Sequence, residues 1–548
     1  MASKDQLVKS LQSADGKPYN KYKELAQFYE LDDITLYADK IQNEPSSYSE
    51  MRVRISFTRS GFPDDTHDTS VKETALRDLI ARRFWESCRM FAKGNSAGEH
   101  GGMISIPRPG QEILERSCVV MTEKFIEVRF KASLPAAGRN AAGRSAVKML
   151  TEDLAEITKA SLFFSSYKRS KLYNHLNTLI TSRNIRSLLR EKGLVAFIAD
   201  GSILPRRADG LAPMSDAVPF ASPVGLRVTF ETADGEAVRG MGIPEGLTAI
   251  IGATYQGKST LIDAIASGVH DHIPGDGREL VITVNDAAVV SRDEGRSVRN
   301  VDASLFISDP SRNTASISTD NADDALSSAI SAAEAMEIGC RLLLIDDMSV
   351  NHSLLYRDAT VSKMIPKGDE TIIPITEWIR GSDISAIIAC RHGDLVGAAD
   401  TVIVVSKHIV SDAAVRKRSA AKTIERPPDR LPLSRNMSAA KGRNEVNSIV
   451  LSASKIEFGE TVIKLPVPLP DICQTAAVAD VMIDAKEMMD GSVTMRDLVK
   501  RLEDISRKRI NSADVNIGPD RAMFRIFDIA AVINRHSGIV VAQKTKLC

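Results

Sequence analysis

Residues 252–260 read GATYQGKST and match the pattern G-x-x-x-x-G-K-[ST] at every defined position. The apolar run Leu247 to Ile251 precedes this stretch, and a helical pattern from Thr260 to Ser267 follows it. Glycines let backbone N–H groups approach phosphate oxygens, and the N-terminus of the next helix adds a positive dipole end. The stretch therefore predicts a strand, a phosphate-binding loop and a helix. The alternative is a chance loop in a fold that binds no nucleotide.

Within this phosphate loop, we expect the lysine and the serine after it to carry most of the chemistry. Lys258 would reach the β- and γ-phosphates of a nucleotide, and Ser259 would bind Mg²⁺. ATP and Mg²⁺ are therefore the expected cofactors. The predicted nucleotide-binding residues are Gly252, Thr254, Tyr255, Gln256, Gly257, Lys258, Ser259 and Thr260.

A second motif, an apolar strand that ends in acids, reads LLLIDD at residues 342–347. Asp346 would hold the Mg²⁺ through a water molecule, and Asp347 would polarise the attacking water. Alternatively, the acid pair caps the next helix. His392 follows the next buried strand and is placed to contact a γ-phosphate, although a single histidine is more often structural. Asp347 and His392 are thus the predicted catalytic residues, and Ser259 and Asp346 the predicted metal ligands.

Several apolar runs around these motifs indicate the fold of the centre of the chain. They are continuous instead of alternating, which is typical of strands buried on both faces of a parallel sheet. Helical or turn-rich segments separate them, so we expect α/β architecture here. The runs are Leu247–Ile251, Val281–Val284, Leu342–Ile345, Ile384–Ala389 and Val402–Val405.

The flanks of this central region have a different character. The first part alternates short strand patterns with helical ones, and the last part resumes at Ile456 as a separate domain. The expected strands are Met51–Phe57 and Ile126–Phe130, with a Gly-rich loop at 95–102 and helical spacing over 151–192. The expected C-terminal helices lie around 495–510 and 522–535. The predicted domains are residues 1–175, 176–455 and 456–548.

The composition of the 548 residues is that of a globular protein, with 43% hydrophobic and 26% charged residues. Lys plus Arg and Asp plus Glu both number 71, which excludes a globally basic nucleic-acid coat but not a local basic groove. No apolar run reaches the ~18 residues of a membrane-spanning helix. The six cysteines form no C-x-x-C pair, and no targeting segment is visible. We therefore expect a soluble, intracellular protein with reduced cysteines.

Together these motifs resemble the stand-alone ATPases of the ABC class, which lack a transporter domain. The resemblance covers nearly the whole chain, and its most specific string is HIPGDGRE at residues 272–279. Further strings are PGQEILER at 109–116, GLVAFIADGSILPR at 193–206 and GMGIP at 240–244. The resemblance implies a central P-loop ABC-type ATPase domain, flanked by an α+β N-terminal domain and a mainly helical C-terminal domain.

The resemblance also implies partners and a location. ABC-class members act as homodimers, in which each nucleotide contacts one subunit's phosphate loop and the other subunit's signature. The chain resembles a kinetoplastid mitochondrial member that is associated with RNA editing. That similarity implies single-stranded RNA as the leading partner, a role in RNA processing and a mitochondrial location.

One segment is a candidate for RNA contacts. Between Arg416 and Arg443, nine Lys or Arg accompany two acids and three prolines, so an extended or irregular linker with a net charge of +7 is expected. Most charge runs are solvated faces, and that alternative stays open here. Aromatic residues, at 5%, indicate no evident stacking platform. The candidate RNA-binding residues are Arg416, Lys417, Arg418 and Lys422, together with Arg52 and Arg54, which share one strand face.

Two departures from the family pattern bear on turnover. Where the family has Ser-Gly in its signature, this chain has Asp323 and Asp324, whose charges would repel a γ-phosphate unless an ion intervened. Where the family has Glu, this chain has the shorter Asp347, and small misplacements can cost ~100-fold in rate. Two functions follow: an ATP-hydrolysing homodimer whose nucleotide state gates RNA binding, or a degenerate member that binds ATP and acts as a scaffold.

Overall fold

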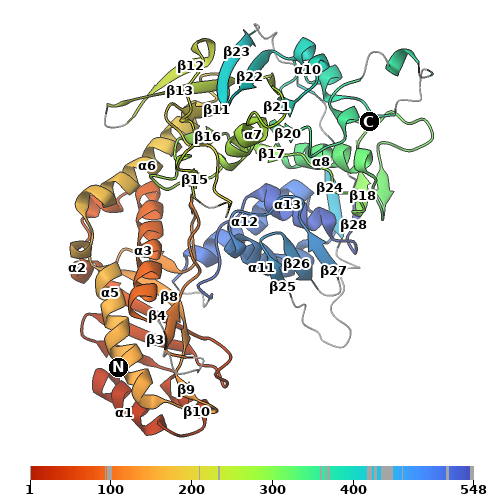
Figure 1. The fold of residues 1–548 in the computed structure, drawn as a ribbon. Helices are drawn as coiled ribbons and strands as arrows, with labels where there is room; N and C mark the ends of the chain where they lie inside the picture. Colours follow the sequence, from red (N-terminus) through yellow and green to blue (C-terminus); the bar gives the residue numbers. More distant parts are fainter. Residues whose placement is uncertain are drawn as a thin grey trace. The chain divides into compact units, whose positions relative to one another are not determined.

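Figure 1 traces the chain in the computed structural model, in which two compact units form, each from two segments. The first unit comprises residues 1–179 and 506–523, and the second comprises residues 180–505 and 524–548. The structure describes residues 2–543 except 93, 95–100, 209, 211, 233–234, 358–360, 365, 367–370, 416–422, 425–426, 428, 434–447, 459–460 and 514–516. The three-domain division expected from the sequence stays a prediction.

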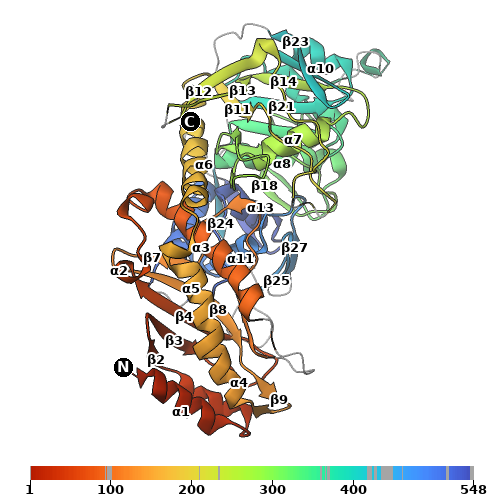
Figure 2. The same ribbon diagram turned by 60° about the vertical axis from the view of Figure 1, so that its left-hand side comes forward.

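A seven-stranded sheet forms the first unit, in the order β1-β2-β3-β4-β8-β5 with β7 paired to β8. Buried residues alternate with half-buried ones along β4 (Ser49–Ser56), because only one face of that strand meets the core. Helices α3 (Ser70–Phe91) and α5 (Leu154–Leu162) pack against each other (Figure 2). The other strands are β1 (Ala2–Ser3), β2 (Phe28–Leu31), β3 (Ile34–Lys40), β5 (Met103–Ser105), β7 (Val119–Met121) and β8 (Phe125–Ser133).

The expectations for the first part of the chain are largely confirmed. The two expected strands are β4 and β8, each with ends shifted by a few residues. The helical spacing over 151–192 corresponds to α5 and α6 (Arg169–Leu188), with a break at residues 163–168. Most of the expected Gly-rich loop at 95–102 lies outside the described residues.

A six-stranded sheet forms the centre of the second unit, in the order β17-β20-β21-β14-β22-β23. Adjacent strands from β17 through β20, β21 and β14 to β22 are parallel, and β23 pairs antiparallel with β22. The parallel strands are β14 (Leu247–Ile251), β17 (Ala287–Val289), β20 (Leu342–Asp346), β21 (Ser385–Cys390) and β22 (Thr401–Ser406); the antiparallel one is β23 (Ile409–Val415). Four of the five apolar runs expected from the sequence are therefore strands of this sheet.

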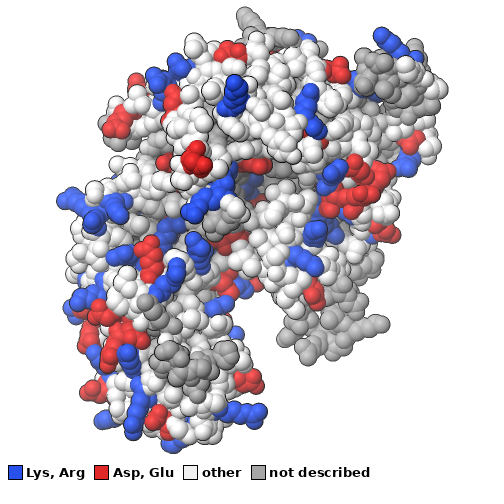
Figure 3. Space-filling view, in the orientation of Figure 1, with Lys and Arg blue, Asp and Glu red and all other residues white. Residues whose placement is uncertain are grey.

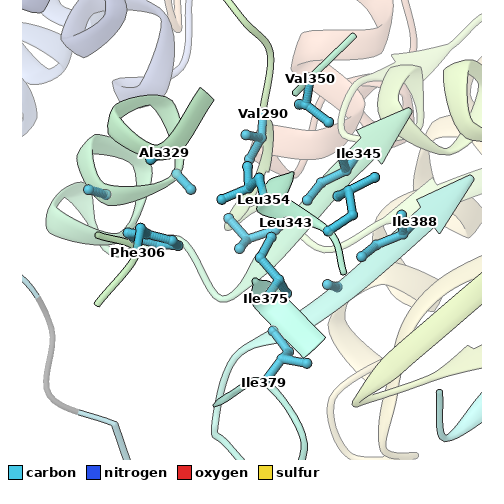
Figure 4. Close-up of a cluster of buried hydrophobic side chains, with 14 of the residues drawn as sticks. Val290, Phe306, Ala329, Leu343, Ile345, Val350, Leu354, Ile375, Ile379 and Ile388 are labelled. Carbon is cyan, nitrogen blue, oxygen red and sulfur yellow. The ribbon is translucent and has the colours of Figure 1, made fainter. Parts of the chain in front are cut away.

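Both faces of this sheet are buried, which explains why the runs are continuous. Leu343 and Ile345 belong to a core that contains Ala329 of α8 (Asp324–Ile338), as Figure 4 shows. Leu342 and Leu344 belong to a second core, with residues of α7 (Lys258–Ser267). Alternate side chains thus serve opposite cores, and β20 has no polar position before Asp346 at its end.

The run Val281–Val284 was assigned wrongly to the parallel sheet. It forms β16 (Val281–Thr283), which pairs antiparallel with β11 (Leu194–Ala199) in a separate sheet of order β12-β13-β11-β16. All three residues of β16 are buried, and α7 contacts the strand. A continuous apolar run therefore reports burial on both faces and not the direction of the partner strand. The remaining strands of this sheet are β12 (Arg227–Glu231) and β13 (Ala237–Pro244).

The C-terminal part combines helices with antiparallel strands, so the expectation of a mainly helical domain is only partly confirmed. Its helices are α11 (Ile472–Met488), α12 (Met495–Asn511) and α13 (Ile526–Arg535). Its strands are β25 (Ser448–Ser452), β26 (Lys455–Phe458) and β27 (Thr461–Lys464), with β24 (Arg430–Leu433) paired to β28 (Val540–Gln543). Among the described residues, no helix has the length and apolarity that a membrane crossing requires.

Candidate nucleotide-binding site

The phosphate loop connects β14 to α7, and its two outer glycines are fixed by close approaches. A Cβ atom on Gly252 would lie 2.3 Å from the carbonyl oxygen of Val405 in β22. Gly257 has a φ of 102° and forms the N-cap of α7. Both positions therefore exclude larger side chains. Between them Tyr255 has a φ of 61° and is 93% exposed, so the tip of the loop projects into solvent.

The lysine of the motif closes the loop on itself. Lys258 is buried, and its Nζ donates hydrogen bonds to the carbonyl oxygens of Gly252 (2.7 Å) and Ala253 (2.8 Å). Gly257 supplies no side chain to cap α7, so no side chain accepts from the first turn at the N-cap. The first N–H groups of a helix have no intrahelical acceptor, which makes this end of α7 suited to an anion.

The turn between β22 and β23 also contacts the phosphate loop, which the motif alone does not indicate. Oε1 of Gln256 accepts a hydrogen bond of 2.6 Å from the backbone N–H of Lys407. A Cβ atom on Gly257 would lie 3.3 Å from Nδ1 of His408. The contact arises because β22 lies beside β14 in the sheet. Only the strand order could have identified these two residues.

The acidic motif ends at the same edge of the sheet as the phosphate strand. Ile251 at the end of β14 is opposite Cys390 in β21, and Ala389 in β21 is opposite Asp346 in β20. A single strand, β21, therefore separates the two motifs. Parallel strands bring their carboxyl ends together, and this is where ligands bind in open α/β sheets.

Asp346 and Ser259 offer the oxygen atoms that Mg²⁺ prefers. Oδ1 of Asp346 accepts a hydrogen bond of 3.0 Å from the N–H of Met348, and Ser259 is exposed in the first turn of α7. Burial, and then the negative charge of Asp346, raises the pKa of Asp263 on α7. A divalent cation between such carboxylates would offset their repulsion. The residues present therefore fit Mg²⁺.

The predicted catalytic residues lie together where β20 and β21 end. Asp347 is 3% exposed, and its N–H donates to the carbonyl oxygen of Ala389 at 2.9 Å. Its Oδ2 accepts from the N–H of Arg391 at 3.2 Å and lies 3.6 Å from Nε of Arg391. His392 follows directly, and its ring centroid is 5.4 Å from that of His352. The sequence indicated no role for His352, which comes from the short helix η6 (His352–Leu354).

Both aspartates of the altered signature have partners within this chain. Oδ1 of Asp323 accepts a hydrogen bond of 2.7 Å from the N–H of Leu326, so Asp323 is the N-cap of α8. Oδ2 of Asp324 accepts from Nδ2 of Asn351 at 3.1 Å and lies 3.7 Å from Nη1 of Arg292. Asp323 thus occupies a backbone donor that an anion would otherwise use.

A cavity of about 430 Å³ lies within the second unit, beside the end of β20 where Asp346 lies. Asp263 and Asp346 form part of its wall, and the segment 465–470 of the C-terminal part forms another. That segment reads LPVPLP. The C-terminal part therefore borders the same space as the carboxylate of Asp346.

The basic segment is only partly described, and one of its charges is buried. Arg416, Lys417, Arg418 and Lys422 lie outside the described residues. Arg430, one of the nine Lys and Arg residues of this segment, is 2% exposed, so the alternative of a solvated face does not hold for it. Its Nε and Nη2 donate to Oε2 of Glu337 in α8 at 2.8 and 2.6 Å, and Nη2 also donates to Oδ1 of Asn534 in α13 at 2.7 Å. Arg430 is therefore part of the buried interior of the second unit, with both of its partners in helices.

Arg52 and Arg54 do share one face of β4, but both are matched to acids within the first unit. Arg52 binds Asp39 through Nε (2.8 Å) and Nη2 (3.0 Å), and its Nη1 donates to Oε2 of Glu127 at 3.0 Å. Nε of Arg54 donates to the same oxygen at 2.6 Å. Both guanidinium groups also lie over the ring of Tyr37. Their contact with RNA stays a prediction.

Charges of the two signs are interspersed on the face of the molecule that Figure 3 shows. Over the face in Figure 3, described Lys and Arg residues alternate with Asp and Glu. That face therefore carries no surface of a single sign within the described part of the chain.

Comparison with protein families agrees with this geometry. Residues 168–441 match the P-loop domain of the model named ABC_ATPase, and residues 4–165 match the model described as ATPase of the ABC class N-terminal. The fold and the phosphate loop thus define a P-loop nucleotide-binding protein. The chain belongs to the family of ABC-class ATPases. Residues 450–542 match the MRB1590 C-terminal domain.

A curated protein is similar over part of the chain. The uncharacterized protein MJ1628 of Methanocaldococcus jannaschii is 32% identical over 169 residues, which cover 29% of this chain and 37% of that protein. The chain therefore matches little more than a third of the length of this relative. The similarity adds no activity, because that protein is itself uncharacterized.

Proposed function

We propose that the protein is an ATP-hydrolysing homodimer of the ABC class that binds single-stranded RNA, and that its nucleotide state gates the RNA-binding surface. The observation that carries the proposal is the juxtaposition of two features. The N-terminus of α7 has no side-chain cap, and it follows a strand whose end lies one strand away from Asp346 and Asp347. Such an edge can hold phosphates and a metal ion together.

Each side chain has a distinct task in this proposal. Lys258 would exchange its two carbonyl acceptors for β- and γ-phosphate oxygens. Ser259 and Asp346 would hold Mg²⁺, which supplies charge neutralisation at the phosphates. Asp347 would accept a proton from the attacking water, and His392 would contact the γ-phosphate. The contact of Arg391 with Oδ2 of Asp347 holds that carboxylate in place.

The match to the MRB1590 C-terminal domain supports the resemblance to the kinetoplastid RNA-editing-associated member, and with it RNA as the partner and a mitochondrial location. Gating also has a physical route. Segment 465–470 and Asp346 border one cavity, so a movement of either would change the shape of the same space. The contacts to RNA would come from Arg416, Lys417, Arg418 and Lys422. Arg52 and Arg54 would take part only if their pairs with Asp39 and Glu127 opened.

A second function is favoured by the signature. Because Asp323 caps α8, a γ-phosphate from a partner subunit would meet an anion where the family offers a neutral serine. In this alternative, ATP binds and stabilises a closed dimer, turnover is negligible, and the protein serves as a scaffold.

Steady-state phosphate release, measured with and without single-stranded RNA, separates the two functions. Turnover that requires Lys258 and changes when RNA is added supports the gated ATPase. Mg-ATP binding without turnover in either condition supports the scaffold. Neither function holds if Mg-ATP fails to raise the melting temperature.

A further inference from the structure

A second cluster of metal-binding side chains lies next to the proposed Mg²⁺ ligands. Asp347, His352 and His392 each offer one ligand atom, and these three atoms all lie within 4.8 Å of one another. The residues come from three positions: the end of β20, helix η6 and the loop after β21. In the part of the chain that the structure describes, no other three His, Cys, Asp or Glu residues converge in this way.

The three side chains keep lone pairs that other contacts do not use. Both contacts of the Asp347 carboxylate with Arg391 involve Oδ2, and no described residue hydrogen bonds to Oδ1. Among the described residues, neither ring nitrogen of His392 has a hydrogen-bond partner. Nε2 of His352 lies 3.1 Å from the backbone oxygen of Asp347. In the tautomer that donates this hydrogen bond, Nδ1 of His352 retains its lone pair.

We propose that Asp347, His352 and His392 form a binding site for a divalent transition-metal ion of the Zn²⁺ class. Two imidazoles and one carboxylate suit Zn²⁺ and its neighbours in the first transition series, whereas Mg²⁺ selects oxygen ligands. Three protein ligands also leave a coordination position for water or a phosphate oxygen. The site is distinct from the Mg²⁺ site, since neither Ser259 nor Asp346 belongs to it.

The three ligand atoms, which lie within 4.8 Å of one another, must move closer together to bind one ion. Metal bonds of about 2.0–2.2 Å place tetrahedral ligands about 3.4 Å apart. His352 is exposed and begins a single short turn, so rotation of its side chain can close the gap. His392 is half-buried and packs on the ring of Tyr356, with centroids 4.8 Å apart, so its ring has a fixed neighbour.

One charge opposes the metal ion. Nε of Arg391 lies 3.6 Å from Oδ2 of Asp347, and its positive charge would weaken the binding of a second cation. Arg391→Gln should therefore tighten metal binding, whereas changing a ligand should weaken it. A purely structural role for the two histidines would give no such opposite effects.

Metal binding here needs no nucleotide, so the inference goes beyond the proposed function. One consequence does rest on that function: the ion would occupy both Asp347 and His392, the groups proposed to act on water and on the γ-phosphate. Zn²⁺ should then inhibit turnover without preventing Mg-ATP from binding at Lys258 and Ser259.

The test uses the full-length protein, freed of metal by a chelator and titrated with Co²⁺ in the absence of nucleotide. We expect one equivalent of Co²⁺ to bind with the visible absorption of a four- or five-coordinate ion, to be displaced by Zn²⁺ and to resist excess Mg²⁺. Loss of an outer-shell partner of a metal ligand typically weakens metal binding about 10–100-fold. His352→Gln removes a ligand itself, so it should weaken Co²⁺ binding by at least that factor. His67→Gln, whose ring stacks on Phe57 in the first unit, is the matched control and should keep the affinity of the wild type.

Three outcomes would overturn the inference: no visible Co²⁺ band, wild-type affinity in His352→Gln, or ready displacement by Mg²⁺. His352 is exposed and lies outside the proposed nucleotide machinery, so this variant should keep the Mg-ATP melting shift of the wild type. Absence of that shift in the wild type would remove the proposed function and leave the Co²⁺ result intact. A normal Mg-ATP melting shift in a protein that does not bind Co²⁺ would overturn the metal site and leave the proposed function intact.

Discussion

The carboxylate of Asp323 accepts a hydrogen bond of 2.7 Å from the backbone N–H of Leu326 and so supplies α8 with its own anion. Helix α7 differs, because its N-cap Gly257 has no side chain to donate or accept. The N-cap side chain of α8 thus already binds one of the first N–H groups of that helix, whereas α7 has no such side chain and leaves its first N–H groups to an external anion. The two helix ends therefore predict strong phosphate binding at the loop before α7. They also predict that the signature at Asp323 and Asp324 contributes little to binding a partner subunit's γ-phosphate.

Restoring the family residues should raise turnover. The triple change Asp323→Ser, Asp324→Gly and Asp347→Glu removes two charges from the signature and lengthens the proposed base. Serine is as good an N-cap as aspartate, so the start of α8 should be preserved. Steady-state phosphate release measures the effect, and unfolding in urea checks stability. No gain in turnover from a folded triple variant would mean that the altered signature does not limit the rate.

Lys258→Ala should abolish the stabilisation that Mg-ATP gives. Its ammonium is the proposed clamp on the β- and γ-phosphates, and a charge-assisted contact is lost with it. At a ligand concentration of 100 times Kd, stabilisation of about 2.7 kcal/mol is expected in the wild type. Melting curves with and without Mg-ATP measure the loss. Lys9→Ala, on the exposed face of α1 (Lys4–Ala14), is the control, and equal shifts in all three proteins would contradict the assignment.

Asp347→Asn should spare ATP binding and lower turnover by about 10²–10⁴-fold, the usual contribution of a general base. The amide oxygen can still accept from the N–H of Arg391, so local geometry is kept, but it cannot take a proton from water. The Mg-ATP melting shift and phosphate release are measured on the same variant. Unchanged turnover would assign the proton transfer to another group.

Acid should destabilise the first unit through Asp78. Burial alone would raise the pKa of Asp78, but the charge of Arg82 and the neighbouring His175 outweigh it and lower the pKa to about 2. The unfolded value is about 3.9, so the unfolded state binds the proton first as the pH falls. The stabilisation is fully present above about pH 5 and is lost progressively towards pH 1, by about 1 kcal/mol at pH 3 and about 2 kcal/mol at pH 2.

Urea unfolding between pH 5 and pH 3 measures this slope. Asp78→Asn should flatten it and also destabilise the protein by about 3–5 kcal/mol at neutral pH, because it breaks a buried pair with Arg82. Asp68→Asn, at an exposed pair with Lys72, is the control and should change stability by less than about 1 kcal/mol. An identical slope in wild type and Asp78→Asn would contradict the lowered pKa.

RNA binding should depend on the basic segment to the same extent for every RNA sequence. Changing its four candidate residues to alanine should weaken single-stranded RNA binding alike for all sequences. Each lost phosphate contact should flatten the dependence of log affinity on log salt by about 0.7. Stability should change by no more than ~0.5 kcal/mol. The four residues are Arg416, Lys417, Arg418 and Lys422.

The control for this variant removes the same charge elsewhere. Four exposed lysines of the first unit, changed to alanine, should leave the salt slope close to that of the wild type. An unchanged slope in the basic-segment variant would identify that segment as a solvated linker and direct the search to Arg52 and Arg54. The control lysines are Lys9, Lys17, Lys23 and Lys124.

The sheet of the second unit could be predicted from the sequence because its signal is local. Leu342 to Ile345 is apolar at every position since alternate side chains meet opposite cores, and glycines and a lysine mark the loop beyond β14. The same signal misassigned β16, because a run of three buried residues carries no information about its neighbouring strand. The apolar residues of a strand indicate that it is buried, whereas the strands that pair with it depend on the topology of the whole domain.

Contacts between distant residues could not be predicted in this way. Arg52 and Arg54 are correctly placed on one face, but their acid, Glu127, lies on another strand. His352 follows Asp347 by only five residues, but the sequence pattern did not show that the intervening turn brings its Nε2 to 3.1 Å from the backbone oxygen of Asp347. In each case the sequence contained the charged or aromatic residue but did not indicate which residue it contacts.

The ion pair between Arg430 and Glu337 limits how this protein can be divided. Arg430 lies on β24, which pairs with β28 near the end of the described chain, while Glu337 lies in α8 of the ATPase core. A fragment that stopped before residue 430 would leave Glu337 buried without its counter-charge, at a cost of about 3–5 kcal/mol. The P-loop domain of the family model ends at residue 441, so it keeps Arg430 but lacks Asn534 and the strand β28 that pairs with β24. Its boundaries therefore do not mark a piece that retains all the contacts of Arg430.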